Sequence, residues 1–182
     1  MKIVAIRKAA ILGAGYIAEF HIRAIKAVRG VELVAICDHN RARAERLQKQ
    51  FTIAQAYDSL DEMLATCDLN VIHILLPPPL HAAAAFKCLE KGRDIFVEKP
   101  FSCSIAEALQ IRAAGQCFGR AIGVNHNNRF HPAFQCLVNA VRDWKLGELE
   151  HLTVCLNVPL RQLSAGQHSH WMFNSPGNIV LE

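Results

Sequence analysis

The stretch that decides the fold is ILGAGYIAEFH at residues 11–21, which sets two glycines between an apolar run and a segment of helical periodicity. A strand followed by Gly-x-Gly-x-x-Ala and a helix is typical of a phosphate-binding turn. Gly13 permits the tight turn, Gly15 lets a pyrophosphate approach the backbone, and Ala18 allows close packing of the helix on the strand. The helix start adds free N–H groups and a partial positive charge. Glycines also punctuate ordinary loops, so the motif needs a second signal.

Asp38 supplies that signal, because it ends the apolar segment LVAIC at residues 33–37. A carboxylate at the end of the second strand can accept hydrogen bonds from the ribose hydroxyls of a dinucleotide. It would also repel the 2′-phosphate of NADP. Because Arg41 and Arg43 could attract that phosphate, NADP stays open, but we predict NAD as the cofactor. The alternative role is a helix cap, which Asp38 or Asn40 could each supply.

Short apolar segments alternate with helical segments as far as residue 125, which is typical of βαβ units. Strands are predicted at 9–12, 33–37, 53–57, 69–76, 94–98 and 121–125. They predict an α/β fold with a doubly wound, Rossmann-type parallel sheet and ligands beyond the carboxyl ends of its strands. The pattern then changes to a loop, a helix to about Trp144 and a strand at 148–158. We expect a dinucleotide-binding domain at 1–124 and, at 125–182, the beginning of a truncated α+β domain for substrate binding and oligomerisation.

The first predicted helix, at about 16–28, carries one stripe of residues that should face the sheet. The stripe consists of Ile17, Ala18, His21, Ala24, Ile25 and Val28. His21 is therefore predicted to be a buried histidine with hydrogen-bond partners. Two later helices begin with capping boxes, Ser59 with Glu62 and Ser104 with Glu107.

Composition and charge narrow the class of protein. The 182 residues are 52% hydrophobic and 20% charged, and no run reaches the roughly 18 apolar residues of a membrane span. The first ten residues lack the order of a secretory signal, so we expect a cytoplasmic protein. The net charge is +4, and the basic residues of segment 41–49 are expected to be solvated, so neither nucleic acid nor a membrane is an expected partner. Seven cysteines without a Cys-x-x-Cys pair predict reduced, mostly buried thiols.

Five stretches, taken in order, resemble the Gfo/Idh/MocA family of NAD(P)-dependent oxidoreductases. They are GAGYIAEFH (13–21), AICD (35–38), PPPLH (77–81), VEKP (97–100) and NHNNRFHP (125–132). The resemblance covers residues 9–182 and leaves residues 1–7 outside. It implies hydride transfer between a nicotinamide cofactor and a sugar-type or cyclitol alcohol, with a small-molecule substrate and a homo-oligomeric full-length protein. The alternative class is a non-catalytic NAD(P)-binding sensor or regulator, which would not need Lys99.

The resemblance also implies which residues meet the cofactor. These are Gly13, Ala14, Gly15, Tyr16, Ile17, Asp38, Leu76, Pro77, Pro78, His81, Glu98, Lys99, Asn128 and Arg129. Lys99 is expected beside the nicotinamide and the substrate hydroxyl, where an ammonium can stabilise a developing alkoxide. Alternatives remain for three of them: Lys99 as a solvated lysine, His81 as a helix-start residue without contacts, and Arg129 as a structural link between domains.

The end of the sequence carries the last candidates. The resemblance assigns Glu182 to the position of a catalytic acid and places the catalytic histidine four positions later, beyond the last residue. We therefore expect the chain to be a fragment. His168 and His170 could place two imidazoles on one side of an extended chain, but a third ligand is not apparent, so no metal site is predicted.

Overall fold

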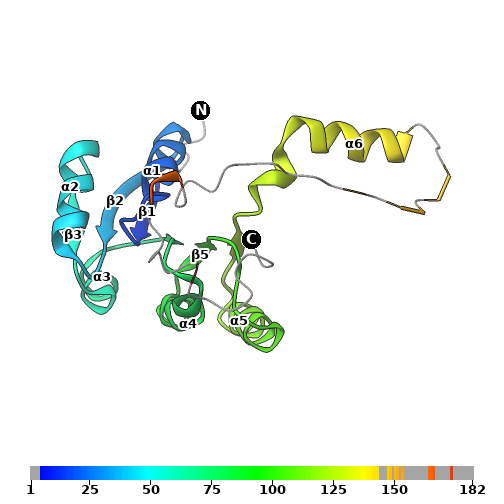
Figure 1. Ribbon diagram of the computed structural model, residues 1–182. Helices are drawn as coiled ribbons and strands as arrows, with labels where there is room; N and C mark the ends of the chain where they lie inside the picture. The colour runs from blue at the N-terminus through cyan, green and yellow to red at the C-terminus, as the bar shows by residue number, and fades with distance from the viewer. Residues whose placement is uncertain are drawn as a thin grey trace. The chain divides into compact units, whose positions relative to one another are not determined.

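A computed structural model describes residues 5–143, 147, 148, 150, 151, 153, 164–166 and 173. The chain divides into two units, Met1–Asn125 and His126–Glu182, which are described separately. The strands of the first unit are β1 (Arg7–Leu12), β2 (Val31–Cys37), β3 (Gln55–Tyr57), β4 (Val71–Ile74), β5 (Asp94–Val97) and β6 (Ile122–Val124) (Figure 1). Its helices are α1 (Ala18–Ala27), α2 (Arg41–Phe51), α3 (Leu60–Thr66), the 3-10 turn η1 (Pro78–Leu80), α4 (His81–Glu90) and α5 (Ile105–Cys117). The described part of the second unit contains η2 (Asn127–Phe130) and α6 (Pro132–Asp143).

The strands form one six-stranded sheet in the order β3-β2-β1-β4-β5-β6, and every neighbouring pair is parallel. The order reverses between β1 and β4, so the predicted doubly wound sheet is confirmed. β1 begins at Arg7 rather than residue 9, because Arg7 pairs with Val31 and its guanidinium bonds Asp94 across the sheet. β4 is shorter than predicted, since the chain leaves the sheet ahead of three prolines that cannot donate to a ladder.

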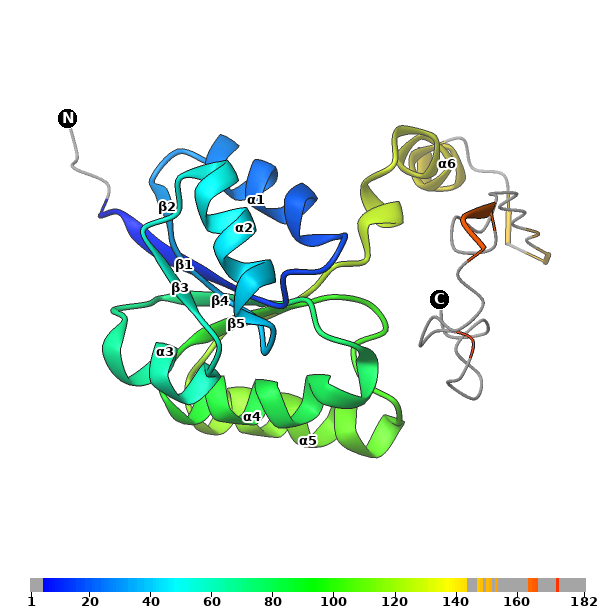
Figure 2. The same cartoon turned by 60° about the vertical axis from the view of Figure 1, so that its left-hand side comes forward.

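Helices cover both faces of the sheet, as Figure 2 shows. α1 and α2 pack on one face, where Ile22 and Leu47 join Ile11 and Ile36 in one core. α3, α4 and α5 pack on the other face around a second core. Strand alternation divides the side chains between the faces, so Ile72 and Ile74 of β4 enter the second core. His73 then points to the face that carries α1.

The buried face of α1 differs from the predicted stripe. Its buried residues are Ala18, His21, Ile22 and Ile25, which recur at i, i+3, i+4 and i+7 and make a single helical face. Ala24 lies beside that face and is exposed. Val28 is the C-cap in an extended conformation and is 54% exposed, so it leaves the stripe. The burial of His21 is confirmed.

Three helices begin with a side-chain cap, in agreement with the sequence. Asn40 accepts a hydrogen bond from the Arg43 N–H at the start of α2. Ser59 caps α3 and Ser104 caps α5 in the same way. Because Asn40 supplies the cap of α2, Asp38 is not needed for it.

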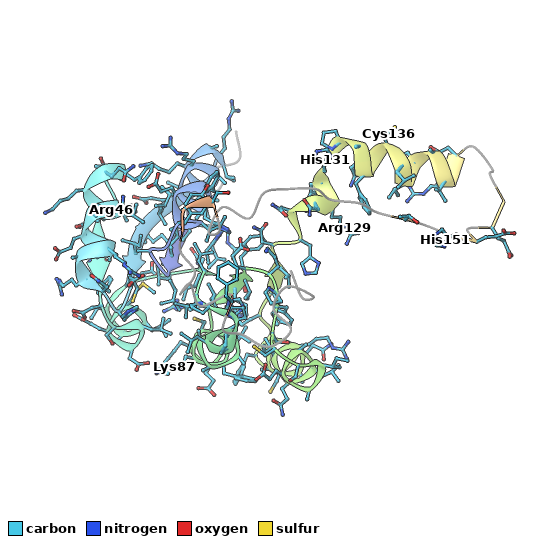
Figure 3. All side chains as sticks on the ribbon, in the orientation of Figure 1. Arg46, Lys87, Arg129, His131, Cys136 and His151 are labelled. Carbon is cyan, nitrogen blue, oxygen red and sulfur yellow. The ribbon has the colours of Figure 1, made fainter. Side chains whose placement is uncertain are left out.

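Other predictions concern the surface and the second unit. Cys37, Cys67 and Cys88 are buried, but Cys103, Cys117 and Cys136 are exposed, so the expectation of mostly buried thiols is wrong for the described residues. Arg46 of α2 pairs with Glu19 of α1, and Lys87 of α4 pairs with Asp61 of α3, so these exposed side chains link neighbouring helices (Figure 3). Of the strand predicted at 148–158, the described residues 148, 150, 151 and 153 are not in a strand, and the others lie outside the described part of the chain.

Candidate functional site

The carboxyl edge of the sheet brings together the residues that follow β1, β4 and β5. The Gly13 N–H donates to the Cys37 carbonyl at 2.7 Å, which ties the turn after β1 to the end of β2. The Leu75 N–H donates to the Leu12 carbonyl at 2.8 Å, and the Glu98 N–H donates to the Ile74 carbonyl at 2.9 Å. The loops that carry the candidate residues therefore start side by side, at the edge where parallel sheets bind ligands.

The two glycines of the turn have different surroundings. Gly13 is buried, with φ at +107°, and a Cβ there would lie 2.7 Å from the Leu75 carbonyl oxygen. Gly15 is exposed, and a Cβ there would meet no atom within 4 Å. The fold itself thus requires the first glycine, whereas the second borders open space that a phosphate could occupy.

The N-terminus of α1 faces the same turn without a capping side chain. Ile17 occupies the N-cap position and makes no side-chain hydrogen bond to the helix. The first N–H groups of a helix need partners, and together with the helix dipole they attract an anion. Ala14 and Ala18 are buried behind the turn, where small side chains let the helix approach the sheet. A pyrophosphate fits this combination of open space, small residues and an uncapped helix.

Asp38 is buried after the end of β2, and its carboxylate accepts hydrogen bonds from the protein backbone. Oδ2 accepts a hydrogen bond from the Ala14 N–H at 2.7 Å, and Oδ1 accepts one from the Asn40 N–H at 2.8 Å. The carboxylate therefore fixes the glycine turn against the end of β2. Each carboxylate oxygen has two lone pairs, so acceptor capacity remains for ribose hydroxyls.

His81 holds the loop after β4 in place. This histidine is only 1% exposed, and its Nε2 lies 2.7 Å from the Leu76 carbonyl while its Nδ1 lies 2.9 Å from the Pro100 carbonyl. It joins the loops that follow β4 and β5, so the alternative of a histidine without contacts is wrong. Leu76 and Pro77 are half-buried and Pro78 is buried, which leaves the backbone of this loop as the part that a cofactor could approach.

Glu98 and Lys99 follow β5, and the peptide bond between Lys99 and Pro100 is cis. Lys99 is half-buried at the carboxyl edge. Glu98 is buried and turns its carboxylate into the protein, where Oε1 accepts from His21 Nε2 at 2.8 Å and from Asn125 Nδ2 at 2.6 Å. Burial would raise the pKa of Glu98, but the hydrogen bonds from His21 and Asn125 outweigh it and lower that pKa. Glu98 is therefore an ionised acceptor.

His21 links this carboxylate to a second histidine. Its Nδ1 lies 3.0 Å from Nδ1 of His73, and the two rings meet edge to face. The pKa of His73 is lowered from its ordinary 6.5 to about 4. Burial is the main cause, the nearby His21 also lowers the pKa, and Glu98 opposes the shift. His73 is thus a neutral hydrogen-bond partner near neutral pH.

The depressed pKa of His73 makes stability depend on pH. Between about pH 6.5 and pH 4 the unfolded chain binds a proton at this residue that the folded chain does not, so stability falls as the pH falls through that range. The whole effect is expected to be about 3 kcal/mol. Urea unfolding of the wild type and His73→Gln at several pH values should show a smaller acid-induced loss in the variant. Parallel losses in both proteins would contradict the assignment.

Sequence reasoning missed His73 and did not foresee the partners of His21. The signal was present in β4, because a histidine between two buried isoleucines must point to the opposite face of the strand. What could not be read was that α1 places His21 over that face. Such a contact joins elements that are distant in sequence.

The other predicted residues lie at the glycine turn, in the second unit or outside the described part of the chain. Tyr16 is exposed at the turn and packs edge to face against Phe20, and Ile17 is half-buried. Asn128 and Arg129 are exposed in η2 of the second unit and stay predictions. Glu182, His168 and His170 lie outside the described residues. Within the described part, no group of three or more His, Cys, Asp or Glu side chains could hold a metal ion. The helices described there include none with the length and apolar character to cross a bilayer.

Comparison with known proteins finds an oxidoreductase family and relatives that are named as dehydrogenases. The Gfo/Idh/MocA model, described as an oxidoreductase family with an NAD-binding Rossmann fold, matches residues 7–126. D-apiose dehydrogenase of Paraburkholderia graminis is 29% identical over 77% of this chain and 37% of that protein. Inositol 2-dehydrogenase 1 of Paenarthrobacter aurescens is 33% identical over 78% of this chain and 43% of that protein. The chain thus spans about two fifths of the length of these relatives.

A solved structure gives the same result in three dimensions. The WlbA dehydrogenase of Chromobacterium violaceum, in complex with NADH and UDP-GlcNAcA, matches with a TM-score of 0.75 and 26% identity, over 81% of this chain and 42% of that one. Two thirds of the chain match the family model, and the six-stranded sheet and its glycine turn are those expected of a Rossmann fold. This chain belongs to the Gfo/Idh/MocA oxidoreductase family.

Proposed function

We propose that the chain is the cofactor-binding part of an NAD-dependent dehydrogenase that acts on a sugar-type or cyclitol alcohol. The observation that carries the proposal is the turn at Gly15, where open space, the uncapped start of α1 and the buried carboxylate of Asp38 meet. The named relatives, a D-apiose dehydrogenase and an inositol 2-dehydrogenase, support the substrate class. NAD, when bound, would supply the hydride acceptor for the alcohol carbon.

The protein groups would divide the work of binding. The turn at Gly13 and Gly15 would hold the pyrophosphate through backbone N–H groups, and Asp38 would accept from the adenosine ribose. The loop at Leu76 and Pro77, fixed by His81, would pass along the nicotinamide ribose. Lys99 would present its ammonium to the substrate oxygen and stabilise the charge that develops as the hydroxyl loses its proton.

We also propose a domain boundary after residue 124, with the following residues beginning a domain for the substrate and for contacts between subunits. This is where the chain changes from the parallel sheet to η2 and α6. The whole protein is proposed to be a cytoplasmic homo-oligomer.

The test of the function is binding followed by turnover. NADH titration of this chain, followed by its fluorescence, should show saturable binding. In the whole protein, a panel of cyclitols, sugars and sugar acids should identify an alcohol that reduces NAD. Lys99→Met should lose that turnover by at least about a hundredfold while keeping NADH affinity. Lys91→Met, which changes an exposed lysine at the end of α4, is the matched control. Saturable NADH binding without turnover of any alcohol would favour the non-catalytic sensor.

Replacing Asp38 should alter the choice of cofactor. We expect Asp38→Ala to weaken NAD binding at least about tenfold, because the ribose hydroxyls lose a charged acceptor. The affinity for NADP should fall less, because the repulsion of its 2′-phosphate disappears with the carboxylate. Both cofactors should lose some affinity, since the Ala14 N–H that Asp38 holds belongs to the glycine turn.

Isothermal titration with NAD and NADP measures the two affinities. Asn40→Ala is the control, because it removes the side-chain cap of α2 and keeps the Asn40 N–H on Asp38. An equal loss for both cofactors would limit Asp38 to holding the turn.

A further inference from the structure

A cluster of buried and half-buried polar side chains is bonded to the backbone of Lys99. Four side chains form it, contributed by α1, by β4 and by the residues after β5 and β6: His21, His73, Glu98 and Asn125. His21 is 6% exposed and Glu98 is 8% exposed. One further hydrogen bond connects the cluster to the backbone: Glu98 Oε2 accepts from the Lys99 N–H at 3.1 Å. The cluster therefore reaches the backbone of the residue proposed to meet the substrate.

The two oxygens of Glu98 have separate tasks. Oε1 accepts from His21 and Asn125, while Oε2 accepts from Lys99. The Asn125 NH₂ and the Lys99 N–H are donors, and an ionised carboxylate, which only accepts, selects the tautomer of His21 that donates from Nε2. An amide in its place would turn its own NH₂ toward a donor in either orientation. The site thus requires a carboxylate and not merely a polar side chain.

The histidine that holds Glu98 is itself held in place. The ring of His73 packs against His21 with centroids 5.3 Å apart and against Phe96 with centroids 5.0 Å apart. Phe96 in turn lies over Gly123 of β6, where a Cβ would come within 2.6 Å of its ring. His21 therefore has one orientation in which Nε2 meets the carboxylate and Nδ1 meets His73. Strands β4, β5 and β6 all contribute to this constraint.

We propose that Glu98 is a positioning residue for the nicotinamide end of NAD, acting through the N–H of Lys99, and that His21 and Asn125 hold its carboxylate for that purpose. The inference rests on the proposed function, because it assigns the nicotinamide end to the Lys99 loop. It replaces direct contact of Glu98 with the cofactor by an indirect role. The contacts proposed between the glycine turn and the pyrophosphate lie outside the cluster and should not depend on it.

The experiment compares NAD with ADP-ribose, which keeps both riboses and lacks only the nicotinamide ring. Glu98→Gln and His21→Leu should each lower NAD affinity about tenfold, which corresponds to about 1.4 kcal/mol, while ADP-ribose affinity stays within about twofold. His21→Gln keeps an N–H donor near the position of Nε2, so it should retain most of the NAD affinity. Glu107→Gln is the matched control, because that carboxylate also accepts from a backbone N–H, at Cys103, but in the α5 capping box.

Amide hydrogen exchange supplies a readout that needs no ligand. The Lys99 amide should exchange at least about tenfold faster in Glu98→Gln and His21→Leu, because its acceptor is lost or displaced. The Leu75 amide, bonded to Leu12 in the sheet, should keep its wild-type rate and report on global stability.

The outcomes separate the possibilities. If NAD and ADP-ribose respond alike in the variants, by losing affinity together or by keeping it, Glu98 does not position the nicotinamide end. An unchanged exchange rate at Lys99, or a loss in His21→Gln as large as in His21→Leu, would also overturn the inference. A wild-type chain that binds neither ligand would instead refute the proposed function.

Discussion

Gly15→Val is expected to weaken NAD binding by at least about a hundredfold, or about 2.7 kcal/mol, and to leave the fold intact. The two effects separate because a Cβ at Gly15 meets no protein atom within 4 Å and the residue is exposed. The new side chain therefore occupies only the space that the pyrophosphate needs beside the start of α1. Isothermal titration measures the affinity, and thermal unfolding without ligand measures the fold.

Ala106→Val is the matched control for this variant. It adds a β-branched side chain at another exposed position, in the first turn of α5, and should change neither measurement appreciably. Gly15→Ala should give an intermediate loss of affinity because its side chain is smaller. NAD affinity within about twofold of wild type in a folded Gly15→Val would show that no phosphate lies at this turn.

Gly13→Ala should have the opposite result and destabilise the folded chain by about 4 kcal/mol. Two causes add: φ at +107° is a conformation that L residues rarely adopt, and the added Cβ would lie 2.7 Å from the Leu75 carbonyl oxygen. That carbonyl belongs to backbone at the end of β4 and cannot swing aside as a side chain could. The melting temperature should fall by roughly 10 to 20 °C.

Gly92→Ala isolates the first of these causes. Gly92 also has a positive φ, at +71°, but a Cβ there meets no atom within 4 Å. It should cost only about 1 to 2 kcal/mol of backbone strain. The difference between the two losses of stability measures the cost of the close contact between the glycine turn and the end of β4. Equal losses would mean that the turn yields freely and that Leu75 does not constrain it.

The sequence predicted the sheet because local patterns determined each element. Apolar runs, the proline exit after β4 and the capping residues Ser59 and Ser104 all act within a few residues of chain. The doubly wound parallel sheet was predicted from the alternation of strands and helices along the chain. The turn between β1 and α1 could be predicted for the same reason, since its glycines are consecutive with the strand and the helix that it joins.

The interior of the site was not readable, because its contacts join distant segments. Asp38 was predicted to face a ribose, yet its bonds to the Ala14 N–H and the Asn40 N–H depend on how two turns meet. His81 left two alternatives open until its ring nitrogens were found on the Leu76 and Pro100 carbonyls. Glu98 was expected at the cofactor, but its carboxylate turns inward to His21 and Asn125. Residue type predicted that these groups matter and left their partners undetermined.

The bond between Asp38 and the Ala14 N–H has a consequence for protein engineering. Redesigning such a protein to use NADP starts by removing the acid, but here that step also removes the acceptor of the Ala14 N–H in the turn that we propose to hold the pyrophosphate. A neutral acceptor such as asparagine or serine would remove the charge and keep a partner for the amide. Variants of this kind should be better starting points than alanine for a change of coenzyme. They remove the charge that selects the coenzyme and keep the hydrogen bond that holds the glycine turn.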